Sequence, residues 1–463
     1  MNRIKAYINE LIGSRFEGDG HKKILKEGFG SLLINFGNKG LSVLMGIILV
    51  RLIGIEGYGI YNFVFAAVVL IGIPAEFGFP NLLIRETAKG ITNDEPGKVK
   101  GLLRWSSIIT GIITVVLLTI SFFVISHQYQ NKELTRVEYL AFLVGLAMVP
   151  LISYLHLLKG ALQGLQRIIL GQLSEQILLP AFYILALAVY FFVPSLNLTP
   201  LSALVIRLGV TALSLIISIV FLVRFLPLQV RKAKNVLIEG KHWIASSTVM
   251  ALSSGLTSIK NRGNIILLGI LATDFDIGTY QIAFSASLIA AILLTATNSV
   301  VAPRFSSLYF SGKMKKLQRL VVMQSQFVFL SNIIITVLYI FFGKLFLSLF
   351  FSKEAVVAYI PLLVMLIGKN VSSLVGSVGF LLNMTGHENQ TMISTGVSLI
   401  LSLVLSFVLI PPLGATGAAI GTSLSLSLAQ FMMWLYIKKH LNINSIALQG
   451  NLLPFSRRKE IDS

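Results

Sequence analysis

The chain has no cysteine among its 463 residues, which excludes disulfide bonds and thiolate metal sites. Charged residues are also scarce, at 12% of the chain, where a soluble domain carries about 25%. The six histidines are scattered without the spacing of metal ligands, and no phosphate-binding loop ending in Gly-Lys-Ser/Thr occurs. We therefore expect no metal, no cofactor and no catalytic residues, and no ATP hydrolysis by the chain itself.

Hydrophobic residues are abundant instead: they make up 55% of the chain, and the mean hydropathy is +0.82. Apolar runs of about 20 residues can cross a hydrocarbon core about 30 Å thick. A backbone in lipid must satisfy its own hydrogen bonds, which helices do. We therefore predict an all-α polytopic membrane protein with twelve transmembrane helices, over approximately 28–52, 60–83, 103–126, 137–158, 168–193, 200–223, 243–271, 278–302, 320–343, 355–383, 391–410 and 415–437.

Basic residues are distributed unevenly over the segments between these runs. With the amino terminus in the cytoplasm, 28 Lys and Arg fall on the cytoplasmic side and 4 on the other. This asymmetry follows the positive-inside rule and predicts cytoplasmic termini and an even number of spans. It also explains the net charge of +19 without nucleic acid as a partner. No cleavable signal peptide is expected, because the first apolar run follows a charged tail and is too long.

The two halves of the chain resemble each other. The segment 54–61 is similar to 274–280, and each is expected to form an external turn between two helices. Upstream of these turns, Asn38-Lys39-Gly40 matches Asn261-Arg262-Gly263. Such a repeat predicts two six-helix lobes around a central cavity, related by a pseudo-twofold axis along the membrane normal. Transporters built in this way bind substrate between the halves and alternate access by rocking.

The repeat also predicts how the chain is divided. The boundary between the lobes is expected in the basic loop that follows the sixth apolar run. Both tails carry an excess of basic residues and are expected in the cytoplasm. The predicted order is a cytoplasmic N-terminal tail (1–27), an N-lobe with helices one to six (28–226), a basic cytoplasmic linker (227–241), a C-lobe with helices seven to twelve (242–437) and a cytoplasmic C-terminal tail (438–463).

Several charged residues interrupt the apolar runs, although a cation at a helix centre costs at least about 2.5 to 3.5 kcal/mol on insertion. Five deep cations against two acids leave an excess of about three positive charges. The repeat places Lys39 and Arg262 at equivalent positions, so we expect them to face each other across the axis. Such a cavity suits phosphate or pyrophosphate. The predicted binding residues are Asn38, Lys39, Arg207, Lys260, Asn261, Arg262 and Lys369.

Other interpretations of these charges stay open. A basic side chain such as Lys260 can reach the headgroups from within a helix. An acid can neutralise a neighbouring cation, for example Glu76 with Lys39, although two acids cannot neutralise five cations. Glu76 and Glu175 lie toward the cytoplasmic third of their helices. There a desolvated carboxylate can bind H+ or Na+ as a coupling ion, or form a salt bridge that locks an inward gate.

Short motifs occur over nearly the whole chain. They are Arg51-Leu52-Ile53-Gly54, Gly57-Tyr58-Gly59-Ile60-Tyr61, Gly78-Phe79, Arg85-Glu86-Thr87-Ala88, Lys159-Gly160-Ala161-Leu162-Gln163-Gly164, Leu268-Gly269, Ile277-Gly278-Thr279-Tyr280, Pro303-Arg304-Phe305-Ser306 and the segment 410–419. Together they resemble the polysaccharide-repeat (O-antigen and capsule) flippases of the Wzx type, within the MOP exporter superfamily. Each motif is short and is shared with other branches of that superfamily.

The resemblance implies a two-lobed transporter that moves undecaprenyl-pyrophosphate-linked oligosaccharide across the bacterial inner membrane, for O-antigen, lipopolysaccharide or another surface polysaccharide. It implies the lipid-linked glycan and membrane lipid as partners, together with the polysaccharide polymerase and chain-length machinery. An ion-coupled drug exporter of the same superfamily is the alternative, although a basic cavity would repel its mostly cationic cargo. A membrane-embedded glycan polymerase or ligase would need large external loops, whereas the predicted external segments of this chain have only about 6 to 15 residues.

Overall fold

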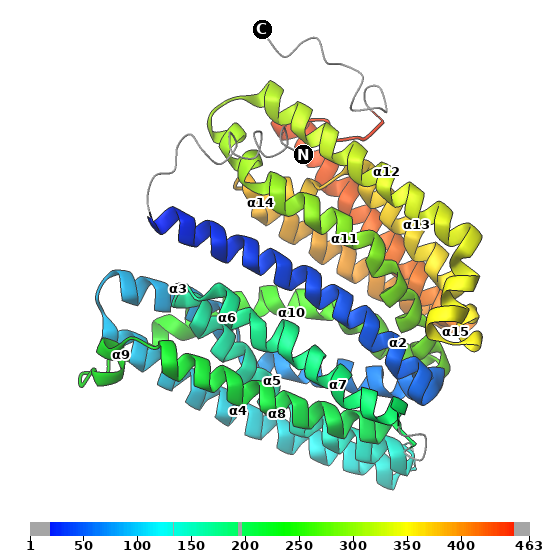
Figure 1. The fold of residues 1–463 in the computed structure, drawn as a ribbon, viewed down its shortest axis with the longest axis horizontal. Helices are drawn as coiled ribbons and strands as arrows, with labels where there is room; N and C mark the ends of the chain where they lie inside the picture. The colour runs from blue at the N-terminus through cyan, green and yellow to red at the C-terminus, as the bar shows by residue number, and fades with distance from the viewer. Residues whose placement is uncertain (1–18, 133, 193–196, 449–463) are drawn as a thin grey trace.

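The chain is predominantly helical over the residues that the structure describes. The computed structural model describes residues 19–132, 134–192 and 197–448, and every regular element in these ranges is a helix (Figure 1). Within these ranges, eight helical segments are long and apolar enough to cross a membrane, which confirms the prediction of an all-α polytopic membrane protein. The long helices are α2 (Asp19–Glu76), α4 (Pro96–Gln130), α5 (Arg136–Gly164), α8 (Pro200–Phe225), α10 (Gly240–Leu271), α11 (Asp274–Phe310), α12 (Met314–Phe346) and α15 (Glu388–Tyr436).

Shorter helices connect or extend the long ones. Three of them are π-helical turns, a form that is rare and frequent at functional sites. One of these turns, η1, carries Glu175. The shorter elements are α3 (Phe79–Thr92), α6 (Ile168–Leu173), α7 (Leu179–Phe192), α9 (Leu228–Lys232), α13 (Tyr359–Val375), α14 (Val378–Met384), the π-turns η1 (Ser174–Leu178), η2 (Leu347–Phe351) and η4 (Ile437–Leu441), and the 3-10 turn η3 (Lys353–Ala358).

Two of the long helices are bent at a glycine. Gly54 in α2 has φ 72° and ψ 178°, and Gly414 in α15 has φ 52° and ψ −130°. Glycine adopts positive φ without a Cβ penalty, so each segment contains two helices joined at one residue. The turns predicted over 54–61 and 274–280 are therefore shorter than expected. The first predicted turn is confined to the bend at Gly54. The second predicted turn lies at 272–273, between α10 and α11.

The predicted helix over 60–83 is interrupted, which corrects the expectation of a continuous span. Phe77 and Gly78 both have positive φ, 44° and 71°, and α3 begins directly after them. A Cβ at Gly78 would lie 2.4 Å from the backbone oxygen of Ser247 in α10. The close approach of α10 at this point therefore requires glycine. At the other end, α2 begins at Asp19, earlier than the predicted residue 28.

α2 runs through the middle of the molecule. In Figure 1 it lies between α11 to α15 on its upper side and α3 to α9 on its lower side. This arrangement puts residues of α2 next to helices from both halves of the chain. The division into lobes at 28–226, 227–241 and 242–437 remains a prediction, and residues 1–18 and 449–463 of the two predicted tails lie outside the described residues.

α10 connects both groups of helices. Near its beginning the fully buried Trp243 packs against Trp105 of α4, with 5.5 Å between ring centroids. Near its end Asn264 Nδ2 donates hydrogen bonds to Thr422 Oγ1 at 2.6 Å and to Ser402 Oγ at 3.3 Å, both in α15. The polar segment around Arg262 is therefore held between these two anchored ends.

α2 and α11 pack backbone against backbone just after their bends. A Cβ at Gly59 would lie 1.8 Å from the oxygen of Asp274, and a Cβ at Gly278 would lie 2.1 Å from the oxygen of Ile55. In the predicted repeat, Gly59 corresponds to Gly278 and Ile55 to Asp274. The two contacts thus exchange when the halves are exchanged, as in a twofold interface. Reciprocity of this kind is what the predicted repeat requires.

Arg51 links the same end of α2 to the end of α12. Its Nε donates hydrogen bonds to the carbonyl oxygens of Phe350 at 2.8 Å and Phe351 at 3.2 Å, and its Nη2 donates to that of Leu349. These carbonyls belong to η2, where a helix ends and carries partial negative charge. A cation from the first half of the chain therefore caps a helix in the second half.

Candidate functional site

Two adjoining cavities lie beside α2. Their volumes are about 300 and 490 Å³, and their walls come from α2, α5, η1, α7, α8, α10 and α11. We call the two together the central cavity, because part of their lining is common to both. The shared residues are Ser42, Met45, Phe65, Val69, Arg207 and Arg262.

Two guanidinium groups in the central cavity stack on the same aromatic ring. Arg207 Cζ lies 4.7 Å and Arg262 Cζ lies 5.3 Å from the ring centroid of Phe65, and Arg207 Cζ also lies 5.3 Å from that of Tyr183. At such distances the negative face of a ring attracts a cation. Phe65 therefore keeps two like charges near each other without neutralising them.

Neither arginine has a carboxylate partner in the described part of the chain. Arg207 Nη1 donates a hydrogen bond to Tyr61 Oη at 3.3 Å, whereas its buried Nε has no partner. Arg262 forms no hydrogen bond with the described residues, and its contact is the Phe65 ring. Several donors of two partly buried cations thus remain available, which is the arrangement that a phosphate oxygen satisfies.

The structure gathers four of the seven predicted binding residues in the central cavity. Asn38 lines the smaller part, Asn261 lines the larger part, and Arg207 and Arg262 line both. The prediction from the intramembrane charges thus locates a cationic cavity. It does not identify Phe65, because a phenylalanine within an apolar run carries no sequence signal.

The three lysines do not line this cavity. Lys369 Nζ donates hydrogen bonds to the Ser287 oxygen and, at 2.9 Å, to Ser287 Oγ. Lys39 does not line the cavity that contains Arg262, so the two cations do not face each other there as expected. Lys260 is partly buried on α10. The helices on which these residues stand were predictable, but the faces were not.

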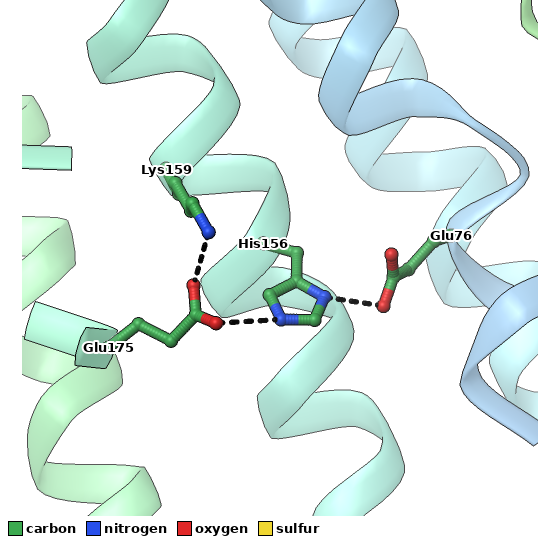
Figure 2. A network of polar contacts seen from close by, with 4 residues as sticks. All are labelled: Glu76, His156, Lys159 and Glu175. Atoms are coloured by element: carbon green, nitrogen blue, oxygen red, sulfur yellow. Dashed lines mark hydrogen bonds and ion pairs between the residues drawn. The ribbon is translucent and has the colours of Figure 1, made fainter. Parts of the chain in front are cut away.

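A polar network borders the central cavity and joins three helices (Figure 2). His156 Nδ1 lies 2.6 Å from Glu76 Oε1 of α2, and His156 Nε2 lies 3.3 Å from Glu175 Oε1 of η1. Lys159, one turn along α5, places its Nζ 2.9 Å from Glu175 Oε2. Glu76 thus pairs with His156 and not with Lys39, which corrects that alternative. The four residues are called the histidine bridge below.

The histidine bridge separates two spaces. His156 and Glu175 line the central cavity, while Glu76, His156 and Lys159 line a third cavity of about 210 Å³ beside Gly78. The two carboxylates contact different nitrogens of the ring and do not converge on one point. No group suited to a metal ion occurs among the described residues. The sequence could not reveal His156 as a partner, since its neighbours come from helices far apart in the chain.

Comparison with known proteins agrees with this architecture. The profile of the polysaccharide biosynthesis protein family matches residues 24–309, more than half of the 463 residues. No curated protein sequence matches the chain. The family match covers every residue of the histidine bridge and both arginines of the central cavity.

Solved structures share the fold at low sequence identity. An inward-facing multidrug resistance MATE family transporter of the MOP superfamily is 13% identical, with a TM-score of 0.73 over 87% of this chain and 94% of that one. The lipid II flippase MurJ in an inward closed conformation is 10% identical, with a TM-score of 0.69 over 88% of this chain and 87% of that one.

A third solved structure is a MOP superfamily transporter from Pyrococcus furiosus, described as having a binding pocket of reverse polarity. It is 16% identical, with a TM-score of 0.58 over 92% of this chain and 96% of that one. These neighbours are transporters and a flippase rather than enzymes, in agreement with the prediction of a non-enzymatic protein. The chain belongs to the polysaccharide biosynthesis protein family and has the fold of MOP superfamily transporters.

Proposed function

We propose that the chain is a flippase that moves undecaprenyl-pyrophosphate-linked oligosaccharide repeat units from the cytoplasmic to the outer leaflet of the bacterial inner membrane. The product would supply O-antigen or another surface polysaccharide, with a polymerase and chain-length machinery acting downstream. The observation that carries this proposal is the pair of arginines on Phe65, which have no acidic partner among the described residues. A pyrophosphate offers the charge and the acceptor oxygens that these donors need.

The topology that we infer has twelve spans in two lobes, with both termini in the cytoplasm. Of the eight candidate segments, α2 and α15 are each bent into two helices. α10 and α11 have 32 and 37 residues, which at about 1.5 Å per residue suffice to cross the membrane. Together these helices supply the predicted number of spans, and the basic loops supply the orientation.

Alternating access is proposed from the packing at the bends. The backbone contact of Gly59 and Gly278, together with the capping of η2 by Arg51, supports closure on the outer side. Glu76 and Glu175 remain candidates for H+ or Na+ coupling or for an inward gate. Outward movement of a negative headgroup is also favoured by the membrane potential, by about 2.3 kcal/mol per charge per 100 mV.

The test uses a host strain that lacks its own flippase and displays surface polysaccharide only when this chain is active. Arg262→Ala and Arg207→Ala each remove a charge-assisted partner of the pyrophosphate, worth about 1.5 to 3 kcal/mol, or roughly 10- to 150-fold in affinity. We expect loss of surface glycan and accumulation of inward-facing lipid-linked precursor at normal protein levels.

Lys260→Ala is the matched control, because it removes a cation from the same helix without touching the central cavity. It should retain activity. Full glycan display in both arginine variants would contradict the cationic site.

An ion-coupled drug exporter is the alternative function, and the observation behind it is the similarity of fold to a multidrug resistance MATE transporter. Under this alternative, expression should confer resistance to organic cations. Neutralising the two arginines should then preserve or increase efflux, whereas a flippase should lose activity. Efflux of a fluorescent cation from loaded cells distinguishes the two functions.

A further inference from the structure

The histidine bridge requires one more proton than a neutral imidazole supplies. Both ring nitrogens of His156 face a carboxylate oxygen, at 2.6 Å and 3.3 Å. An ionised carboxylate only accepts hydrogen bonds, and a neutral imidazole carries a single N–H. With a neutral ring, one of the two contacts would therefore join two lone pairs. A doubly protonated ring donates a hydrogen bond to Glu76 and forms an ion pair with Glu175.

The charges around the ring lead to the same result. Glu76 on α2 and Glu175 on η1 contribute two negative charges, and Lys159 contributes one positive charge on the same helix as His156. When His156 is protonated, the bridge is neutral. When His156 loses that proton, the bridge carries one net negative charge. The side chains that α3 presents to the adjoining cavity, Pro80, Asn81 and Ile84, are uncharged, and α4 lines neither cavity.

The other charged residues that line the smaller part of the central cavity belong to the anion site. Glu175 and His156 line the same 300 Å³ cavity as Arg207 of α8 and Arg262 of α10. A deprotonated bridge would leave Glu175 with Lys159 alone and add a negative charge to the wall of the central cavity. That charge repels a bound anion and attracts the arginines that should hold it. Protonation of the bridge and anion binding should therefore favour each other.

We propose that Glu76, His156 and Glu175 form a proton-binding site that controls the affinity of the arginine pair for its anion. The inference rests on the proposed function, because it takes the anion to be the pyrophosphate of a lipid carrier. It names H+ as the coupled ion and His156 as the residue that carries it. Since His156 contacts one carboxylate in each of two cavities, a proton can enter on one side and leave on the other.

The experiment measures proton uptake when the purified full chain in nanodiscs binds undecaprenyl pyrophosphate. Titration calorimetry in two buffers of different ionisation enthalpy gives the number of protons bound per anion. His156→Gln keeps a hydrogen-bonding side chain but cannot carry the charge. The terminal phosphate of the probe titrates as well, with a second pKa near 6, so the difference between wild type and H156Q is the informative quantity.

At the pH where the His156 ring of the free chain is half protonated, which a pH series of the imidazole spectra described next locates, we expect the wild type to take up more protons than H156Q. We also expect it to bind the probe at least about fivefold more tightly, the lower end of typical coupling between sites. His242→Gln changes an exposed histidine at the start of α10 and should behave as the wild type. Equal proton uptake and equal affinity in wild type and H156Q would overturn the proposal.

A second measurement needs no anion. In spectra of the ¹⁵N-histidine-labelled chain, the imidazole signal that is lost in H156Q should report a doubly protonated ring at neutral pH. A singly protonated ring would overturn the proton site whether or not the probe binds. Failure of the wild type to bind the probe, together with a doubly protonated ring, would instead contradict the proposed function while supporting the proton site.

Discussion

Replacing Gly278 by alanine is expected to open the contact between α2 and α11. The new Cβ would lie 2.1 Å from the backbone oxygen of Ile55, whereas real Cβ contacts essentially never fall below 3.0 Å. The overlapping atom belongs to the main chain, so no side-chain rotation relieves the clash. The two backbones must therefore separate by at least 0.9 Å, the difference between those two distances.

The cost falls only on the conformation in which the contact is made. Overpacking of this kind costs about 1 to 3 kcal/mol. Each 1.4 kcal/mol changes an equilibrium constant about tenfold. The ratio of outer-open to outer-closed molecules should therefore rise roughly 5- to 150-fold, because the alanine has room once the helices part.

The absence of cysteine makes this ratio measurable. Ser42 lines both parts of the central cavity, so Ser42→Cys introduces a single thiol there. A membrane-impermeant maleimide applied from outside reaches that thiol only when the outer side is open. The labelling rate in S42C/G278A should exceed that in S42C by the same factor. Gly209→Ala is the matched control, because a Cβ at that position meets nothing within 4 Å.

An unchanged labelling rate in correctly folded G278A protein would refute the reasoning, since the contact would then contribute nothing to outer closure. An equal increase in the Gly209→Ala control would show that added alanine affects the helices generally. Thermal unfolding checks that the variants are correctly folded: G278A and the control should unfold as cooperatively as the wild type.

Two further predictions concern other parts of the chain. Phe65→Leu preserves an apolar side chain but removes the ring on which two guanidiniums stack. At about 0.5 to 2 kcal/mol per cation–π contact, precursor translocation should fall severalfold, while Phe65→Tyr should retain most of it. The hydrogen bond from Lys98 Nζ to Glu239 Oε1, 2.8 Å long, lowers the pKa of Glu239. A carboxyl with a lowered pKa stabilises the folded state at pH values above its ordinary pKa. This stabilisation is lost as the pH falls through the lowered pKa. The protection of the amides at 237–240, that is, their exchange rate relative to an unstructured chain at the same pH, should therefore decrease in acid. In Glu239→Gln the protection should already be low at neutral pH, and protection that does not change with pH in the wild type would contradict this prediction.

Much of the fold was predictable because lipid restricts the choice of backbone structure. Apolar runs separated by polar or glycine-containing breaks indicated where helices end, and the breaks after 52 and after 410 contain Gly54 and Gly414, where the bends occur. The interruption at Phe77 and Gly78 was not predictable. It depends on the approach of α10 to the backbone at Gly78, while the local composition stays apolar.

The candidate site was predictable in its charge but not in its partners. A cation within an apolar run needs a partner that offsets the cost of its burial. Arg207 and Arg262 could therefore be predicted as site residues from the sequence. The repeat placed Lys39 level with Arg262, yet equivalence between halves specifies the height in the membrane more firmly than the direction of a side chain. Lys39 does not line the cavity that contains Arg262. Phe65 and His156 could not be predicted from the sequence, because their roles arise from contacts between helices that are far apart in the chain.

The capping of η2 by Arg51 has a consequence for how this protein can vary. All the acceptors are carbonyl oxygens of residues 349–351, which every amino acid supplies. The side chains there are free to change without loss of the interaction, whereas Arg51 has no equivalent substitute, because a lysine lacks the planar fork that reaches several acceptors. Related sequences should therefore keep the arginine beside a variable partner segment, and analysis of correlated substitutions would miss the contact.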